Sequence, residues 1–178
     1  MDGGVIENCL LTDNSTRSGA IYLNAASARA VNCTVVSNRL SSSLDNALAA
    51  GVRVNNASAK VVNCVIYDNG GGSAKEEWGN ANANCFTNCA FAEGAAYSGT
   101  ASTVTNLTAA AFRNYANGDY RPAKDGALVN AGTKWADYLS FGATSETDLA
   151  GAARLSGKFL DIGCYEGTSG VGFQIIVR

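Results

Sequence analysis

Two stretches of this chain align with each other without a gap: AIYLNAASARAVNCTVVSN, residues 20–38, and GVRVNNASAKVVNCVIYDN, residues 51–69. Both contain an Asn-Cys dipeptide at the same position, and the chain has two more such dipeptides, at 8–9 and 88–89. The four dipeptides follow one another at intervals of 24, 31 and 25 residues. This recurrence predicts a repeat protein whose units stack, because a unit of this size cannot bury its apolar face alone.

Each repeat unit has the residue pattern of short β-strands separated by turns. In the second unit, alternation places Val31, Cys33 and Val35 on one face, which we expect to point to the interior. A second strand at 21–23 aligns with 52–54 and has apolar residues at the same alternate positions. Stacking such units would join their apolar faces into one continuous core.

We therefore predict an all-β fold, a right-handed parallel β-helix solenoid with about four coils over residues 1–94. The longest interval contains RLSSSLDNALA, residues 39–49, which we expect to form a loop that leaves the strands in register. The last coil of such a stack exposes an apolar cross-section and unpaired strand edges. Residues 95–178, where the dipeptides no longer recur, are expected to form an irregular C-terminal cap of the same domain.

Asparagines also recur at a fixed distance after the dipeptides. Asn14, Asn38 and Asn69 each come five residues after the cysteine of their unit. In a stack with about 4.8 Å between units, such residues lie over one another and can pass amide hydrogen bonds along the column. Asparagine also tolerates the left-handed backbone conformation that sharp corners require, so we expect a structural role for this column.

The cysteines are Cys9, Cys33, Cys64, Cys85, Cys89 and Cys164. Alternation turns the four that follow an asparagine to the interior, where a free thiol behaves as a small apolar group. We therefore favour a column of reduced thiols. Disulfides between neighbouring coils are the alternative, although parallel side chains that point the same way have poor geometry for a bridge. A metal site is disfavoured, because CxxxC at 85–89 has no second pair and the chain has no histidine.

Charge and composition bear on the expected partners. The formal net charge is −2 without a dense cluster of Lys and Arg, so we do not expect nucleic acid as a partner. No stretch reaches the ~20 apolar residues that a transmembrane helix needs. We predict a monomer with no cofactor and no metal. The start, residues 1–4, lacks the basic region and apolar run of a signal peptide, so we expect an upstream portion.

Four motifs follow one another in the C-terminal half: GDYR at 118–121, ALVNAG at 127–132, TDLAG at 147–151 and DIGCYE at 161–166. In this order they resemble the C-terminal region of bacterial right-handed β-helix surface proteins, often called choice-of-anchor or polymorphic outer-membrane-like proteins. The upstream repeat resembles the coils of the same family. Pro122, Asn130 and Cys164 depart from its usual residues, which are Leu, Asp and Ala. The resemblance implies a secreted or cell-surface protein of a bacterium.

The charged residues of these motifs have two possible roles. Asp148, Arg154, Asp161 and Glu166 are expected to form ion pairs and turn hydrogen bonds within the cap. The alternative is a cation bound by the three carboxylates.

The pattern of acidic residues does not predict a catalytic site. A lyase needs a carboxylate cluster for calcium together with a basic residue, and a glycosidase needs two carboxyl groups about the scissile bond. The fifteen acidic residues are scattered, and those in the coils, such as Asp13, Asp68 and Glu93, fall mostly at turns. We therefore assign no catalytic residue.

One outward column predicts a binding surface. The self-alignment places Tyr22, Arg53 and Trp78 in this column, with Glu76 and Glu77 close to it. Aromatic rings beside a charged side chain suit sugar rings. The alternative is that these residues pack against an insertion loop or simply cover the sheet.

The leading hypothesis is a non-catalytic scaffold or adhesin that contacts polysaccharide or host or bacterial glycans through this column. The alternative is the C-terminal part of a pectate-lyase-like, polysaccharide-degrading enzyme whose active site lies in coils upstream.

Overall fold

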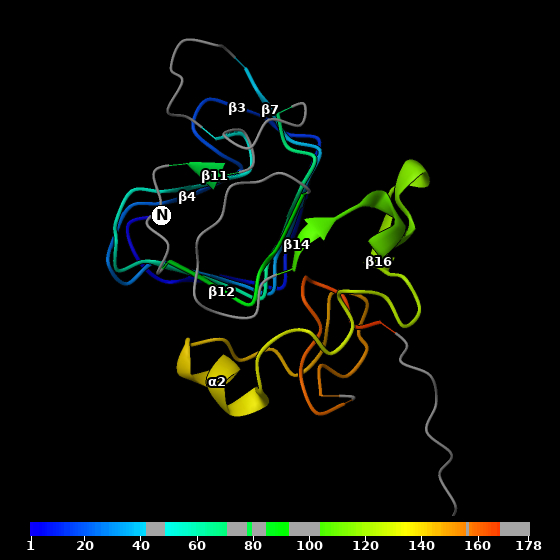
Figure 1. The fold of residues 1–178 in the computed structure, drawn as a ribbon. Coiled ribbons are helices and arrows are strands. Elements are labelled where there is room, and N and C mark those ends of the chain that lie inside the picture. The colour runs from blue at the N-terminus through cyan, green and yellow to red at the C-terminus, as the bar shows by residue number, and fades with distance from the viewer. Residues whose placement is uncertain (42–48, 71–77, 80–84, 93–103, 156, 168–178) are drawn as a thin grey trace, which may run out of the picture.

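The computed structural model describes residues 1–41, 49–70, 78–79, 85–92, 104–155 and 157–167 of the chain (Figure 1). The regular structure of these residues is mainly β-strand, and nearly all of the strands belong to parallel sheets. The described helical segments are short: the α-helix α2 (Trp135–Ser140) and the 3-10 turns η2 (Ala109–Ala111) and η3 (Tyr115–Asn117). The expected all-β class is confirmed.

Three parallel sheets are built from equivalent strands of successive units. The first contains β1 (Val5–Glu7), β5 (Arg29–Val31), β9 (Lys60–Val62) and β12 (Phe86–Thr87). The second contains β2 (Leu10–Thr12), β6 (Thr34–Val36), β10 (Val65–Tyr67), β13 (Ala90–Ala92) and β14 (Val104–Leu107). The third contains β4 (Ile21–Leu23), β8 (Val52–Val54) and β11 (Trp78–Gly79).

Two smaller pairs complete the described strands. The strands β3 (Ser15–Thr16) and β7 (Arg39–Leu40) pair in parallel, so the first residues of the insertion expected at 39–49 extend the repeat. The remainder of that insertion, at 42–48, lies outside the described residues. The strands β15 (Phe112–Asn114) and β16 (Asp119–Pro122) form an antiparallel pair in the C-terminal half.

The pairing register follows the repeat found in the sequence. Thr34 pairs with Leu10 of the preceding unit and with Val65 of the following one, which are the 24-residue and 31-residue offsets of the dipeptides. Phe86 pairs with Val61, the 25-residue offset. The self-alignment therefore gives the strand pairing in the first sheet and among β2, β6, β10 and β13 of the second, because identical columns bring equivalent backbone groups together.

The interior between the sheets is filled by small and medium apolar side chains. Cys33, Val35, Val54 and Ile66 are among the fully buried members of this core. Apolar side chains of the first unit, such as Leu11, pack against the same core but are only partly buried. The core is continuous from unit to unit, and Cys33 and Val35 lie in it as the alternation predicts. The expected inward position of Val31 is wrong: Val31 packs in a separate cluster with Tyr138 and Leu160, because the left-handed Asn32 turns the chain between Val31 and Cys33.

The corners of the units are formed by asparagines in the left-handed conformation. The asparagine of each dipeptide has a positive φ, of 58°, 47°, 52° and 48° at Asn8, Asn32, Asn63 and Asn88. Asparagine is one of the few residues that occupies this region readily, because its short polar side chain hydrogen-bonds locally. This conformation explains why the dipeptide begins with asparagine in every unit.

The predicted column of Asn14, Asn38 and Asn69 forms a hydrogen-bonded ladder. Asn14 Nδ2 donates to Asn38 Oδ1, and Asn38 Nδ2 donates to Asn69 Oδ1, both at 2.8 Å. The backbone N–H groups of Asn14 and Asn38 donate to the same two oxygens at 3.1 Å. Asn38 and Asn69 are fully buried, so the ladder satisfies polar groups inside the protein.

All six cysteines are free thiols, five of them buried and Cys9 half-buried. Cys33 and Cys64 donate S–H hydrogen bonds to backbone carbonyls such as Val31 O and Val62 O. A hydrogen bond to Cys64 raises the pKa of Cys33 well above its ordinary value, and burial does the same for Cys64. These groups are therefore protonated and unreactive in the folded protein.

We expect brief treatment of the folded protein with iodoacetamide to leave the five buried cysteines unmodified, with any early product confined to Cys9. Alkylation requires a thiolate that solvent can reach, and solvent does not reach the five buried thiols. Mass spectrometry of tryptic peptides gives the result, with protein unfolded in urea as the control, where all six cysteines should react. Fewer than six reactive thiols in unfolded, unreduced protein would contradict the reduced column.

The C-terminal half begins at the end of the stack and then runs along its side. We expected residues 95–178 to cover the last unit, and β14 does pair with the outer edge of β13. Further described residues of this half instead bond to Asn8, Asn32 and Asn63, which belong to three successive units. Figure 1 shows this part of the chain beside the stacked strands. The described C-terminal region therefore flanks the stack and ties its units together.

Candidate functional site

Two residues of the predicted outward column lie side by side. Tyr22 of β4 pairs with Arg53 of β8, and both are half-buried. The Arg53 guanidinium carbon is 5.1 Å from the centroid of the Tyr22 ring, which is a cation–π contact. Since stacked units place equivalent side chains over one another, the repeat itself produces this contact.

Exposed amides lie at the end of the same strands. Asn55 Nδ2 donates to Asn24 Oδ1 at 2.8 Å, so these asparagines form a second, shorter ladder. The Tyr22 hydroxyl donates to the same oxygen at 3.2 Å. Asn24 Nδ2 in turn donates to Asp2 at 3.1 Å. The aromatic ring, the guanidinium and the amides thus belong to one connected polar surface.

The other residues expected on this surface are Trp78, Glu76 and Glu77. The pairing joins Trp78 to Val52 and Gly79 to Arg53, so Trp78 is one position away from the column in which we expected it. The reason is that the segment from β11 to the next dipeptide is one residue shorter than the equivalent segment after β8. Glu76 and Glu77 lie outside the described residues.

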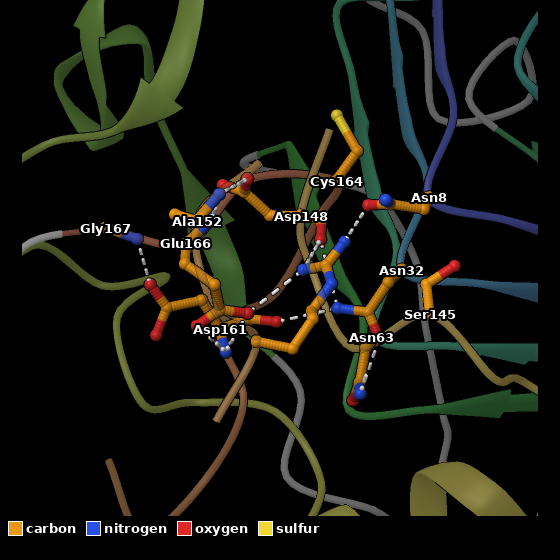
Figure 2. Close-up of polar contacts among 12 residues, drawn as sticks. Asn8, Asn32, Asn63, Ser145, Asp148, Ala152, Asp161, Cys164, Glu166 and Gly167 are labelled. Atoms are coloured by element: carbon orange, nitrogen blue, oxygen red, sulfur yellow. Dashed lines mark hydrogen bonds and ion pairs between the residues drawn. The ribbon is translucent and has the colours of Figure 1, made fainter. Parts of the chain in front are cut away.

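A buried polar cluster joins the C-terminal half to the stack. Its centre is Arg154, whose side chain is 0% exposed. Arg154 Nη1 donates to the carbonyl of Gly163 and to Glu166 Oε1, both at 3.0 Å, and Nη2 donates to Asn8 Oδ1. Figure 2 shows Asn8, Asn32 and Glu166 converging on this place. One arginine therefore links the first unit to the last described segment of the chain.

The asparagines of the dipeptides form the stack's side of this cluster. Asn32 Nδ2 donates to the carbonyls of Asp161 and Gly163 at 3.0 Å. Asn63 Nδ2 donates to Asn32 Oδ1 at 3.1 Å and to Thr133 Oγ1 at 2.9 Å, while Asn63 Oδ1 accepts from the Thr133 N–H. Because the left-handed corner directs these side chains away from the core, they are available to bind the flanking chain.

Gly163 fits closely against the same surface. Its φ is +103°, and a Cβ at this position would lie 2.7 Å from Thr34 Oγ1. Its N–H donates to the carbonyl of Asn63 at 2.7 Å. The glycine of the DIGCYE motif is therefore required both by its backbone conformation and by its close approach to the sheet.

The acidic residues of the C-terminal motifs accept hydrogen bonds from backbone N–H groups. Asp148 Oδ1 accepts from Ala150 and Ala152 at 2.9 and 2.7 Å, and Asp148 Oδ2 accepts from Glu166 at 2.8 Å. Asp161 Oδ1 accepts from the Asn130 N–H at 2.6 Å. These bonds and the Arg154–Glu166 ion pair match the structural role expected for the charged residues.

The polar groups of this cluster bond to one another and so hold the C-terminal half against the stack. Among the described residues, no group of three or more His, Cys, Asp and Glu side chains is placed to hold a metal ion. The oxygens of Asp148 that a cation would need are instead directed at N–H donors. The alternative of a cation held by Asp148, Asp161 and Glu166 is therefore not supported by the described part of the chain.

A second set of contacts between the stack and the C-terminal half was not predicted from the sequence. The carboxylate of Glu7 accepts from the Thr144 N–H at 2.8 Å, from Ser145 Oγ at 2.9 Å and from the Tyr138 hydroxyl at 3.3 Å. Burial alone would raise the pKa of Glu7, but the hydrogen bonds from Thr144 and Ser145 outweigh it and lower the pKa. Glu7 directly precedes the first dipeptide, which is the only sequence signal that points to it.

We expect the free energy of unfolding to fall as the pH rises from about 5 to about 8. Burial and the neighbouring Asp161 carboxylate raise the pKa of Glu166 to about 7 against an ordinary 4.5, although Arg154 opposes this shift. Between these values the folded state binds a proton more tightly than the unfolded chain. The stability that this proton contributes is therefore present in mild acid and is lost as the pH rises through about 7.

Urea unfolding at several pH values measures this dependence. Glu166→Gln should flatten it, because the amide keeps the shape of the side chain without a titration. Glu7, whose pKa is lowered, acts in the opposite direction only as the pH falls below its ordinary value of 4.5. If the free energy of unfolding changes equally with pH in the parent and in Glu166→Gln, a group other than Glu166 causes the pH dependence.

None of the helices in the described residues is long and apolar enough to cross a membrane. In comparisons with known proteins, no family model, no curated protein and no solved structure matches this chain.

Proposed function

We propose that this chain is a segment of a right-handed parallel β-helix that serves as a non-catalytic scaffold or adhesin in a secreted or cell-surface protein of a bacterium. We further propose that it contacts glycans through the outward column of Tyr22 and Arg53.

The pairing of equivalent strands supports the solenoid. In each later unit, the residue after the cysteine donates its N–H to the cysteine carbonyl of the unit before it: Thr34 to Cys9, Val65 to Cys33 and Ala90 to Cys64, each at 2.9 Å. Each of the three parallel sheets repeats this kind of pairing from strand to strand, which gives the regular stack that an extended scaffold requires.

The observation that carries the glycan proposal is the contact between Tyr22 and Arg53 beside Asn24 and Asn55. Sugar rings pack against aromatic side chains, and their hydroxyls exchange hydrogen bonds with guanidinium and amide groups. Both kinds of group occur here on neighbouring strands, and the asparagines are exposed. The regular stack holds them at a fixed spacing, which favours an extended ligand.

A glycan array followed by titration calorimetry tests this proposal. We expect weak binding by the parent and a loss of about tenfold or more in the double variant Tyr22→Ala/Arg53→Gln. Arg17→Gln, which changes an exposed arginine of the first unit, is the matched control and should bind like the parent. Equal binding by the parent and the double variant, or no binding by the parent to any glycan on the array, would overturn the proposed contact.

A further inference from the structure

A polar hollow lies where three of the C-terminal motifs meet. It has a volume of about 430 Å³ and is lined by residues 117–121, by Leu149 and Ala150, and by Tyr165. The motifs GDYR, TDLAG and DIGCYE, which are separate in the sequence, each contribute to this lining. The hollow shares no residue with the column of Tyr22 and Arg53.

One arginine in the hollow is held in a fixed orientation with one of its nitrogens unused. Arg121 Nε donates to Asp119 Oδ1 at 2.7 Å, and Arg121 Nη2 donates to Asp119 Oδ2 at 2.9 Å. This two-point contact fixes the plane of the guanidinium. Nη1 has no hydrogen-bond partner among the described residues, and the side chain is 45% exposed.

The local charge favours an anion over a neutral ligand. Arg113 Nε also lies 3.8 Å from Asp119 Oδ2, so two guanidinium groups share one carboxylate. The buried Asp148 carboxylate also lies near Arg121, and three backbone N–H groups donate to it and balance part of its charge. Among the exposed side chains, Arg113 and Arg121 exceed Asp119 by one positive charge, which favours a carboxylate in the hollow.

The remaining lining suits a sugar ring. Tyr165 is half-buried, and its hydroxyl forms no hydrogen bond with any described residue. Leu149 is 45% exposed in the same hollow, so its apolar side chain is accessible to a ligand there. An aromatic ring with a free hydroxyl beside an exposed apolar side chain can pack against a sugar and bind one of its hydroxyls.

We propose that this hollow binds a uronic acid unit of an acidic polysaccharide. The sugar carboxylate accepts hydrogen bonds from Arg121 Nη1, and the sugar ring packs against Tyr165 and Leu149. Asp119 is a positioning residue, because it orients Arg121 without contacting the ligand. The inference does not depend on the Tyr22 column, and either site can exist without the other.

The experiment compares two ligands and five proteins by titration calorimetry. The ligands are a uronic acid trisaccharide, trigalacturonate, and the same trisaccharide with its carboxyl groups reduced to alcohols. The proteins are the parent, Arg121→Gln, Tyr165→Phe, the control Arg17→Gln and the double variant Tyr22→Ala/Arg53→Gln, all checked for folding by circular dichroism. Tyr165→Phe removes a single oxygen that bonds to no described residue, so this variant should fold normally.

We expect millimolar or tighter binding of trigalacturonate by the parent and by Arg17→Gln. Arg121→Gln should weaken it about tenfold or more, and Tyr165→Phe roughly threefold, since a charged hydrogen bond contributes more than a neutral one. Binding to the parent should weaken with added salt, and the reduced trisaccharide should bind the parent about as weakly as trigalacturonate binds Arg121→Gln.

Three results would each overturn the inference: no binding by the parent, equal binding of the two ligands, or unchanged binding in both Arg121→Gln and Tyr165→Phe. The double variant Tyr22→Ala/Arg53→Gln separates this site from the proposed function. If it abolishes trigalacturonate binding while Arg121→Gln does not, the ligand occupies the Tyr22 column and the hollow is not its site.

Discussion

Replacing Arg154 by methionine should destabilise the protein by about 3–5 kcal/mol at neutral pH. Arg154 is fully buried, and its loss leaves the Glu166 carboxylate, the Gly163 carbonyl and Asn8 Oδ1 without their shared donor. A buried carboxylate that loses its counter-charge carries a large desolvation cost. The change in the free energy of unfolding can be measured by urea denaturation monitored by fluorescence.

Two further variants distinguish the loss of the Arg154–Glu166 ion pair from the loss of packing contacts. Because a raised pKa lets Glu166 take up a proton in mild acid, the cost of Arg154→Met should be smaller at about pH 5 than at about pH 8. Adding Glu166→Gln to Arg154→Met should recover part of the lost stability, whereas Arg17→Met on the exposed surface should change it by less than about 0.5 kcal/mol. A cost below about 1 kcal/mol for Arg154→Met would show that the Arg154 contacts contribute little to the free energy of unfolding.

The second large effect is expected at Asn63. Asn63→Ala should cost about 3 kcal/mol or more, because alanine disfavours the left-handed conformation and leaves the Thr133 N–H and hydroxyl without their partners. Asn63 has a φ of 52° and is 0% exposed. The same denaturation experiment measures the loss.

The chain offers a matched control in the fourth unit. Asn88 occupies the same repeat position with a φ of 48°, yet it is only half-buried and bonds to no described residue of the flanking chain. Asn88→Ala should therefore cost only the conformational part, about 1–2 kcal/mol. If both alanine variants cost the same, the bonds between Asn63 and the flanking chain contribute nothing measurable, and the backbone conformation explains the whole effect.

Much of the stacked half could be predicted from the sequence because its determinants are local and periodic. Alternation places Cys33 and Val35 in the interior, and the recurrence of Asn14, Asn38 and Asn69 predicts their ladder. Such columns need no knowledge of distant contacts, since stacking places equivalent positions over one another. The one error of register, at Trp78, comes from a unit whose connecting segment is a single residue shorter.

The candidate sites could be predicted only in part. The contact between Tyr22 and Arg53 follows from the repeat, so the self-alignment finds it. Glu7 and the asparagines of the dipeptides were assigned no partner, because nothing in their own unit indicates what binds them. Their partners lie in the C-terminal half, where no period relates one residue to another.

By itself, the sequence determines that this chain stacks its units, at which intervals it does so, and that side chains such as Cys33 and Val35 turn inward. Those properties follow from short-range alternation and from a repeat that brings like residues together. Only the tertiary structure shows that the C-terminal half runs along the stack, and that the motifs around Arg121, Leu149 and Tyr165 form one hollow. The bond between Asn8 and Arg154 spans 146 residues of the chain. Contacts of this range depend on how the whole chain packs.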